Sequence, residues 1–363
     1  MSAKLTDGDS PVLDRRTLNR TLLLRQHLLS PATLSVEAMI EHLVGMQAQE
    51  PQAPYVGLWN RIEAFDPEQL SDLIVERSAV RGGLMRSTVH LVTAADYKLL
   101  WPLMSTVLAG AFRGSQFRKA IAAARTEDIV GAGRALIDEQ PRTRAELRSL
   151  LAERWPEIDP TSLAYTVSAH TPLVQVPPRG LWRGSGQARL ATADKWLGCK
   201  LREQPARGTR EQVVRRYLAA FGPTTVNDVQ AWCGLTGLRA VVDGMRGELR
   251  MFRDERGAEL IDVAGAPFAD AGTAAPPRIL APFDNVILGH DDRSRIIATE
   301  HRGVLFGDRL MRAFLIDGFF AGTWRLDGDG IAFEHIGRVR KADRAALGEQ
   351  AERLRDFLIA APR

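Results

Sequence analysis

Residues 143–178, TRAELRSLLAERWPEIDPTSLAYTVSAHTPLVQVPP, carry the clearest structural pattern of the chain. Thr143 followed by Glu146 is a capping box, which predicts the start of a helix. Apolar residues at helical spacing continue that helix to about Trp155. Pro160 opens a further helix, and Pro172 ends it. The stretch therefore predicts two successive helices, followed by an apolar run of the kind that forms a strand.

The segments around this stretch complete a motif of three helices and a hairpin. Residues 126–138 have the pattern of an earlier helix, and residues 173–178 and 188–193 flank a glycine-rich turn. This order is typical of a winged helix, whose third helix usually enters the major groove of DNA. A similar order recurs at 209–263, with Thr224 or Thr225 as a helix cap, and more loosely at 13–93. A long helix at about 94–125 is expected to join the first copy to the second.

The pattern changes after residue 263. Residues 264–283 are rich in alanine, glycine and proline, which is typical of a linker. Strand-like runs follow, including NVILG at 285–289 and GVLF at 303–306, and an amphipathic helix closes the chain. We therefore expect an α+β, mainly helical fold with tandem winged helices and then a small antiparallel β-barrel. The expected divisions are a first region at 1–125, winged helices at 126–205 and 206–263, a linker at 264–283 and a barrel at 284–363.

Composition restricts the class of protein more than its function. Arginine supplies nearly all of the 48 basic residues, which suits phosphate binding but also suits a GC-rich genome. The polar N-terminus and the lack of a long apolar run predict a cytoplasmic protein that does not enter a membrane. The sequence has no nucleotide-binding fingerprint and no metal-ligand spacing, so we expect neither a cofactor nor a metal.

An unusual pair of glutamines lies at Gln47 and Gln49, before a proline-interrupted turn. In an extended segment both side chains would lie on the same side, with Ala48 facing the other way. Polar residues also commonly end helices by bonding to the backbone, so the pair alone leaves a structural role open.

Three separate segments resemble the winged-helix DNA glycosylases of the AlkZ and AlkX group, which excise alkylated purines and unhook interstrand crosslinks. These segments are QAQEPQAPYVGLWNRI at 47–62, LMRSTVHLVTAADY at 84–97 and APFDNVILGHDDRSRII at 281–297. The resemblance spans nearly the whole chain and implies the same architecture of tandem winged helices and a barrel. It also implies that Gln47 and Gln49 are the active-site residues, in a Gln-x-Gln form similar to the branch associated with resistance to DNA-alkylating natural products. Ser87 departs from the family pattern, where glycine is expected more often.

The chemistry of the implied substrate suits a neutral pair. An N7-alkylated guanine is already cationic, so the base can leave without a general acid. The enzyme must then hold a water beneath C1′ and tolerate a cationic sugar, and an amide oxygen can do both. We assign Gln49 to positioning the water and Gln47 to orienting the water or the sugar.

A bulky adduct argues against turning the base fully out of the duplex. The sequence next to the glutamines offers only Tyr55 and Trp59 as aromatic residues, and their helical spacing favours the core. We therefore expect an open concave surface, with the base still held by its partner strand.

Further DNA- or lesion-binding candidates come from the matching segments and from the predicted wings and third helices. Each also has an ordinary structural interpretation, as a strand, turn or solvated surface residue. They are Arg86, His90, Asn285, His290, Asp292, Arg293, Arg183, Arg239 and Arg246.

The expected function is that of a monofunctional DNA glycosylase, acting as a monomer on duplex DNA that contains alkylated purines, in DNA repair or self-resistance. No lysine lies inside the matching segments except Lys98 at an edge, so water is favoured over an amine nucleophile. Two alternatives stay open: a winged-helix transcription regulator and a non-catalytic lesion-binding protein. A regulator would bind according to base sequence, and a lesion-binding protein would not need the glutamine pair.

Overall fold

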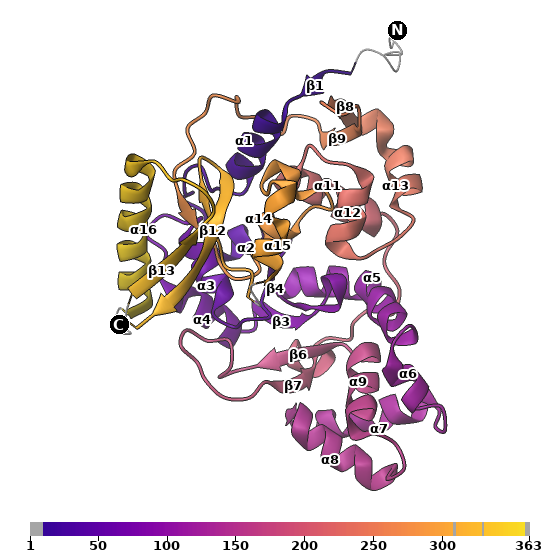
Figure 1. The fold of residues 1–363 in the computed structure, drawn as a ribbon. Coiled ribbons are helices and arrows are strands. Elements are labelled where there is room, and N and C mark those ends of the chain that lie inside the picture. Colours follow the sequence, from indigo (N-terminus) through magenta and orange to yellow (C-terminus); the bar gives the residue numbers. More distant parts are fainter. Residues whose placement is uncertain (1–9, 308–309, 329, 360–363) are drawn as a thin grey trace.

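The computed structural model describes residues 10–307, 310–328 and 330–359, and the fold is mixed α+β (Figure 1). The polar residues 1–9, on which the expectation of a cytoplasmic location partly rests, lie outside this description. Across the described residues, no helix is long and apolar enough to cross a membrane.

The first region is a group of helices over a strand hairpin. Asp14 and Ser35 cap α1 and α2, because each side chain accepts a hydrogen bond from the backbone N–H three residues on. The elements are α1 (Arg15–Arg25), α2 (Val36–His42), β2 (Met46–Gln47), α3 (Ala53–Trp59), α4 (Pro67–Val75), β3 (Ala79–Gly83), the 3₁₀ turn η1 (Met85–Ser87) and β4 (Val89–Thr93).

The long connecting helix expected at 94–125 is broken. Helix α5 (Ala94–Arg113) ends at Gly114, and the short helix α6 (Gln116–Ala120) begins after Ser115. Glycine inside a helix costs about 1 kcal/mol relative to alanine, and serine favours a helix start over a helix interior. The two residues together account for the break.

The second region contains the predicted helices and hairpin. The capping box is present: the Thr143 N–H donates to Glu146 at 2.7 Å, and the Glu146 N–H donates to the Thr143 hydroxyl at 3.1 Å. The short strand before the second helix pairs with the last strand of the hairpin. The elements are α7 (Thr126–Glu139), β5 (Arg142–Thr143), α8 (Arg144–Arg154), α9 (Pro160–His170), β6 (Leu173–Val176), β7 (Arg189–Thr192) and α10 (Ala193–Trp196).

The third region repeats this order. Thr225 and Asp228 form its capping box, and Thr224 pairs with Ile261 of the last strand. The elements are α11 (Thr209–Phe221), α12 (Val226–Cys233), α13 (Leu238–Met245), the 3₁₀ turn η2 (Arg246–Glu248), β8 (Leu249–Asp254) and β9 (Glu259–Val263). Strand β1 (Val12–Leu13) joins this hairpin in parallel with β8, so the start of the described chain packs on the third region.

The hairpins of the first two regions form one sheet. Its strand order is β2-β4-β3-β6-β7-β5, and β3 is joined to β6 with Arg81 opposite Gln175 and Gly82 opposite Val174. Figure 1 shows α7–α9 below this sheet, at the end of the molecule opposite α1 and β8. The first hairpin is therefore held directly against the second region.

The prediction of a C-terminal β-barrel is wrong. The C-terminal strands form an open four-stranded sheet in the order β10-β11-β12-β13, and α16 packs on it instead of further strands (Figure 1). Four strands are too few to close into a barrel. The elements are β10 (Arg278–Ile279), β11 (Ala313–Ile316), β12 (Phe319–Asp327), β13 (Gly330–His335) and α16 (Lys341–Ile359).

Two apolar runs expected to be strands are helices. The run at 285–289 forms α14 (Asn285–Leu288), because the Asp284 carboxylate accepts from the Val286 N–H at 3.0 Å and so caps a helix. The run at 303–306 lies in α15 (Arg302–Gly307), which follows the 3₁₀ turns η3 (Arg293–Arg295) and η4 (Thr299–His301). Short apolar runs do not distinguish a strand from a buried helix by periodicity.

The largest group of buried apolar side chains joins distant parts of the chain. It includes Leu22 of α1, Val92 of β4, Trp232 of α12, Ile287 of α14 and Leu315 of β11. The end of the expected linker also enters the interior, because Ile279, Leu280 and Ala281 are buried. The first hairpin, the third region and the segment after residue 280 thus pack around one core.

Candidate active site

Gln47 lies at the edge of the six-stranded sheet, after a turn that requires glycine. Gly45 has a φ of +96°, and a Cβ there would lie 2.5 Å from Cγ1 of Val92. The chain leaves α2 through this turn, and β2 then places Gln47 opposite His90 of β4. Gln47 is buried and Gln49 is exposed, whereas Ala48 between them is completely buried.

Arg86 holds the Gln47 side chain. The Arg86 Nη2 donates to Oε1 of Gln47 at 2.8 Å, and its Nη1 donates to the backbone oxygen of Trp232 in α12. Burial, and to a lesser degree the nearby charge of Arg293, lowers the pKa of Arg86 to about 10. This arginine remains a cation at neutral pH, and it connects the first hairpin to the third region.

The backbone at Arg86 and Ser87 has an unusual conformation. Arg86 and Ser87 have φ values of +53° and +60°, in the left-handed region that favours glycine. A glycine at position 87 would adopt this conformation without strain, which agrees with the expectation of glycine there.

Two further candidates, His90 and Asn285, lie beside Gln47. His90 is buried, and burial together with the charge of Arg86 lowers its pKa to about 3, so the ring is neutral. Its Nε2 is buried without a hydrogen-bond partner among the described residues. Asn285 donates through Nδ2 to the backbone oxygen of Gly45 at 2.7 Å, and it lines a small cavity together with Gln47. The structure therefore brings together Gln47, Arg86, His90 and Asn285.

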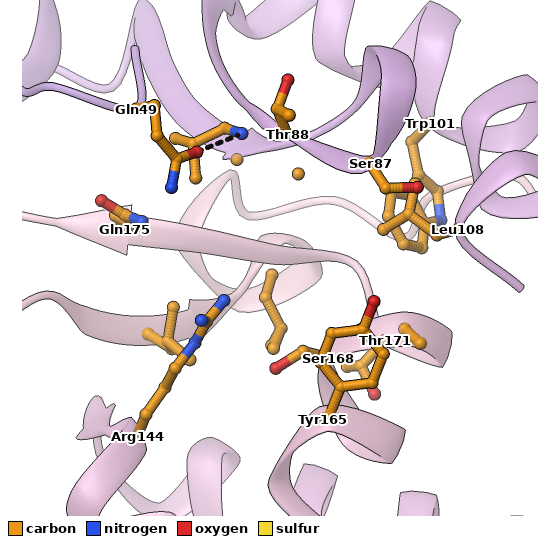
Figure 2. Close-up of a pocket in the computed structure, with 16 residues that line it drawn as sticks. Gln49, Ser87, Thr88, Trp101, Leu108, Arg144, Tyr165, Ser168, Thr171 and Gln175 are labelled. Carbon is orange, nitrogen blue, oxygen red and sulfur yellow. Dashed lines mark hydrogen bonds between the residues drawn. The ribbon is translucent and has the colours of Figure 1, made fainter. Parts of the chain in front are cut away.

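Gln49 lines a different and larger cavity, of about 180 Å³, between the first hairpin and α9 (Figure 2). Its Oε1 accepts one long hydrogen bond, 3.4 Å, from the Val89 N–H. Across the cavity α9 contributes Tyr165, Ser168 and Ala169. The described lining includes no carboxylate and no lysine; it consists of Gln49, Gly82, Gly83, Ser87, Thr88, Val89, Trp101, Leu108, Arg144, Tyr165, Ser168, Ala169, Thr171, Leu173, Gln175 and Leu190.

Arg293 lies near Arg86. Its guanidinium lies over the ring of Phe306, 4.9 Å from the centroid, and its Nε is buried with no partner among the described residues. Burial, followed by the charge of Arg302, lowers the pKa of Arg293. Arg293 is thus a second cation, close enough to Arg86 for its charge to help lower the pKa of Arg86.

His290 and Asp292 take part in contacts within the fold. His290 is buried beside Tyr217, and its Nε2 lies 3.1 Å from the backbone oxygen of Phe221. Burial is the main cause that lowers the pKa of His290 well below its usual value. Asp292 caps η3 and pairs with Arg256 and Arg302.

The structure does not bring the three wing and third-helix arginines to the glutamines. Arg183 donates to the backbone oxygen of Leu358 in α16. Arg239 and Arg246 both pair with Glu259 of β9, at 3.1 and 2.9 Å. These three side chains remain candidates for contacts with DNA outside the cavity.

The aromatic residues next to the glutamines belong to the interior. Tyr55 is completely buried and donates to the backbone oxygen of Gly180 at 2.9 Å. Trp59 is half-buried and packs against Phe357 of α16, with centroids 5.9 Å apart. Among the described residues, no group of three histidine, cysteine or acidic side chains could hold a metal ion.

Comparison with known proteins identifies the family. A family model described as DNA glycosylase AlkZ-like matches residues 40–357, which include both glutamines and the whole lining of the cavity. The chain belongs to the AlkZ-like DNA glycosylase family. It is therefore an enzyme that acts on DNA and hydrolyses N-glycosyl bonds.

A curated protein and a solved structure, both from Streptomyces sahachiroi, are similar to this chain. A curated relative, "Interstrand DNA cross-link repair glycosylase", is 22% identical over 332 residues, covering 84% of this chain and 85% of the relative. The solved structure of Streptomyces sahachiroi DNA glycosylase AlkZ aligns with a TM-score of 0.78 and 19% identity, over 96% of each chain. This likeness shows that the two proteins share a fold.

Sequence reasoning missed the far wall of the cavity in this AlkZ-like glycosylase. Several residues far from Gln49 in the sequence line the same cavity. At least 50 residues separate Gln49 from each of Trp101, Arg144, Tyr165, Thr171 and Gln175. The available signal was on α9, where Tyr165, Ser168 and Ala169 share one face at i, i+3 and i+4. That face was predicted to belong to a DNA-binding helix, but nothing in the sequence placed it opposite the first hairpin.

Proposed function

We propose that this AlkZ-like glycosylase hydrolyses the N-glycosidic bond of N7-alkylated purines in duplex DNA, with Gln47 and Gln49 as a Gln-x-Gln active site. The observation that carries the proposal is the position of Gln49 at the edge of a cavity without described carboxylates, with Gln47 close by and held by Arg86. An uncharged purine would leave slowly from such a site, because nothing there can protonate it. A cationic purine needs only a positioned water.

The contacts of the two glutamines support separate roles. The Gln47 carbonyl oxygen is engaged by the Arg86 cation, which would oppose a positive charge developing on the sugar nearby. Gln49 makes only one long hydrogen bond through its carbonyl, so this oxygen can accept from a water. We assign Gln49 to positioning the attacking water and Gln47 to orienting that water or the sugar.

The nucleophile in this proposal is water. A lyase would need an amine close to C1′, and the described lining of the cavity contains no lysine. The product is then a free base and an intact abasic site, as expected for a monofunctional glycosylase.

We infer that the second and third regions are winged helices that bind the duplex. Each has three helices followed by a hairpin, and the segment between the first two helices pairs with the last strand, through β5 in the second region and through the single residue Thr224 in the third. In this proposal α9 and α13 face DNA, and Arg183, Arg239 and Arg246 contact phosphates. Arg239 and Arg246 would exchange the Glu259 carboxylate for phosphate oxygens.

The similarity to an interstrand DNA cross-link repair glycosylase supports a wider substrate range. A crosslink between N7 atoms presents the same cationic leaving group as a simple N7-alkylated guanine. We therefore propose that bulky and crosslinked N7 adducts are also substrates, in DNA repair or in self-resistance to an alkylating natural product, and that the enzyme acts as a monomer.

A base-release assay tests this function. The purified full-length chain is incubated in excess over a duplex that carries one N7-methylguanine, and an unmodified duplex is the control. We expect free 7-methylguanine, together with strand breaks that appear only after alkali, because a hydrolase leaves the abasic site intact. Binding to damaged DNA without base release would indicate a non-catalytic lesion-binding protein. Binding that depends on base sequence would indicate a transcription regulator.

A further inference from the structure

The cavity beside Gln49 has two unlike walls. One wall is the first hairpin, with Gly83 and Val89, and the other is the face of α9 that carries Tyr165 and Ser168 (Figure 2). A Cβ on Gly83 would lie 3.4 Å from Leu108, which also lines the cavity. The glycine therefore keeps one side of the cavity free of a side chain.

Two buried oxygens in this lining lack hydrogen-bond partners. Thr171 is 1% exposed, and its Oγ1 has no partner among the described residues. The Oε1 of Gln175, on β6, is likewise buried and unpartnered. An unsatisfied buried polar group costs about 1–3 kcal/mol, so a ligand that donates hydrogen bonds would be favoured here. The N–H groups on the base-pairing edge of guanine are such donors.

The size and the aromatic residues of the cavity fit one nucleobase. The buried Trp101 and the half-buried Tyr165 line the cavity with aromatic rings, and aromatic side chains bind bases by stacking. The volume of about 180 Å³ is below the roughly 300 Å³ at which pockets for drug-sized ligands begin. A single purine is a ligand of the appropriate size class.

The opening of the cavity suits the sugar-phosphate backbone. Its exposed lining residues are Gln49, Ser87 and Arg144. Arg144 is the first residue of α8, and its side chain forms no hydrogen bond and no ion pair with the described residues. An unpaired guanidinium beside a neutral cavity is suited to a backbone phosphate.

We propose that this cavity receives the modified purine after it has turned out of the duplex, with Arg144 on a neighbouring phosphate of the same strand. The inference rests on the proposed function, and it departs from the expectation that the base stays with its partner strand. Gln49, at the opening, would then lie beside the sugar of the extrahelical nucleotide. A bulky N7 substituent would extend out through the opening while the base fills the interior.

The test measures extrusion separately from catalysis. A duplex carries N7-methyl-2′-fluoro-2′-deoxyguanosine opposite thymine, because the fluorine destabilises a cationic sugar and so preserves the glycosidic bond. Permanganate oxidises a thymine whose partner base has left the stack. We expect the wild-type chain to increase oxidation of that thymine several-fold over DNA alone.

Two variants fill the cavity from opposite walls. Gly83→Val and Ser168→Phe should return thymine oxidation to the level of free DNA and lower release of 7-methylguanine about tenfold or more. Gly272→Val is the matched control, because a Cβ there meets nothing within 4 Å. Arg144→Ala should weaken binding and reduce the salt dependence of binding, whereas Arg148→Ala, on the same helix but outside the cavity, should not.

The outcomes separate the two proposals. Base release by the wild type, with unreactive thymine and with wild-type rates in whichever cavity-filling variants fold, overturns the extrahelical pocket and leaves the glycosylase proposal intact. Absence of base release by the wild type from any N7-alkylated duplex overturns the glycosylase proposal itself. If neither filling variant folds, unreactive thymine with the wild-type chain bound still overturns the pocket.

Discussion

Arg86 is a cation in a largely buried position that has no carboxylate partner among the described residues. Its guanidinium instead donates hydrogen bonds to Oε1 of Gln47 and to the backbone oxygen of Trp232. The planar fork of arginine can reach two such acceptors at once, and an ammonium group cannot reproduce that geometry. Arg86 is therefore a positioning residue that fixes the orientation of the Gln47 amide.

This assignment predicts the effect of Arg86→Lys. The charge is kept, but the Gln47 amide loses its fixed donor, so the single-turnover rate of base release should fall about tenfold. Affinity for undamaged duplex should change little, because the nearby charge is conserved. A variant with a normal release rate and weakened binding would show that Arg86 acts on the DNA backbone and not through Gln47.

Some residues of the candidate site could be named from the sequence alone, and others could not. Gln47, Gln49, Arg86 and His90 could be singled out because they lie in two recognisable segments, and β2 and β4 place those segments side by side. The cavity wall on α9 could not be predicted, because its position depends on the pairing of β3 with β6. No local pattern specifies which hairpins join edge to edge.

At the level of secondary structure, a buried ion pair joins the first helix to the third region. Arg25 of α1 and Asp262 of β9 are both completely buried in their side chains and form two hydrogen bonds, at 2.7 and 2.8 Å. Removing one partner leaves an uncompensated buried charge, which costs about 3–5 kcal/mol. Replacing both with apolar residues removes that cost.

The predicted result concerns the free energy of unfolding. Asp262→Leu alone should destabilise the protein by about 3–5 kcal/mol, and adding Arg25→Met should restore much of that loss. Denaturant unfolding of the two single variants and the double variant measures the coupling. The opposing result is that Asp262→Leu lowers the free energy of unfolding equally in the wild-type protein and in the Arg25→Met variant. That result would show that the two side chains are not coupled.

Helices with strong end signals were predictable, and short apolar runs were not. The capping boxes at Thr143 and Thr225 fix the starts of α8 and α12, where local hydrogen bonds decide the outcome. The run at 285–289 became a helix because Asp284 caps it and also pairs with buried Arg61, at 2.7 Å. That choice depends on a partner 223 residues away, so the sequence pattern did not indicate it.

At the scale of the whole molecule, the candidate site is assembled from three separate parts of the chain. Strand β2 and the first hairpin supply Gln47 and Arg86, α12 supplies the Trp232 carbonyl, and α14 supplies Asn285. The second region closes the cavity of Gln49 from the other side. The tandem order of the regions was predictable, but their packing around one core with an open C-terminal sheet was not.

Gln49 is the residue on which the proposed glycosylase activity depends most. The most direct measurement is the single-turnover rate of 7-methylguanine release by Gln49→Ala, compared with the wild type and with Gln69→Ala, an exposed glutamine on α4. Loss of one such polar group in an active site costs about 10²–10³ in rate, so we predict a fall of that size with unchanged affinity for DNA. Gln69→Ala should match the wild type. A Gln49→Ala variant that releases base at the wild-type rate would show that Gln49 has no part in catalysis.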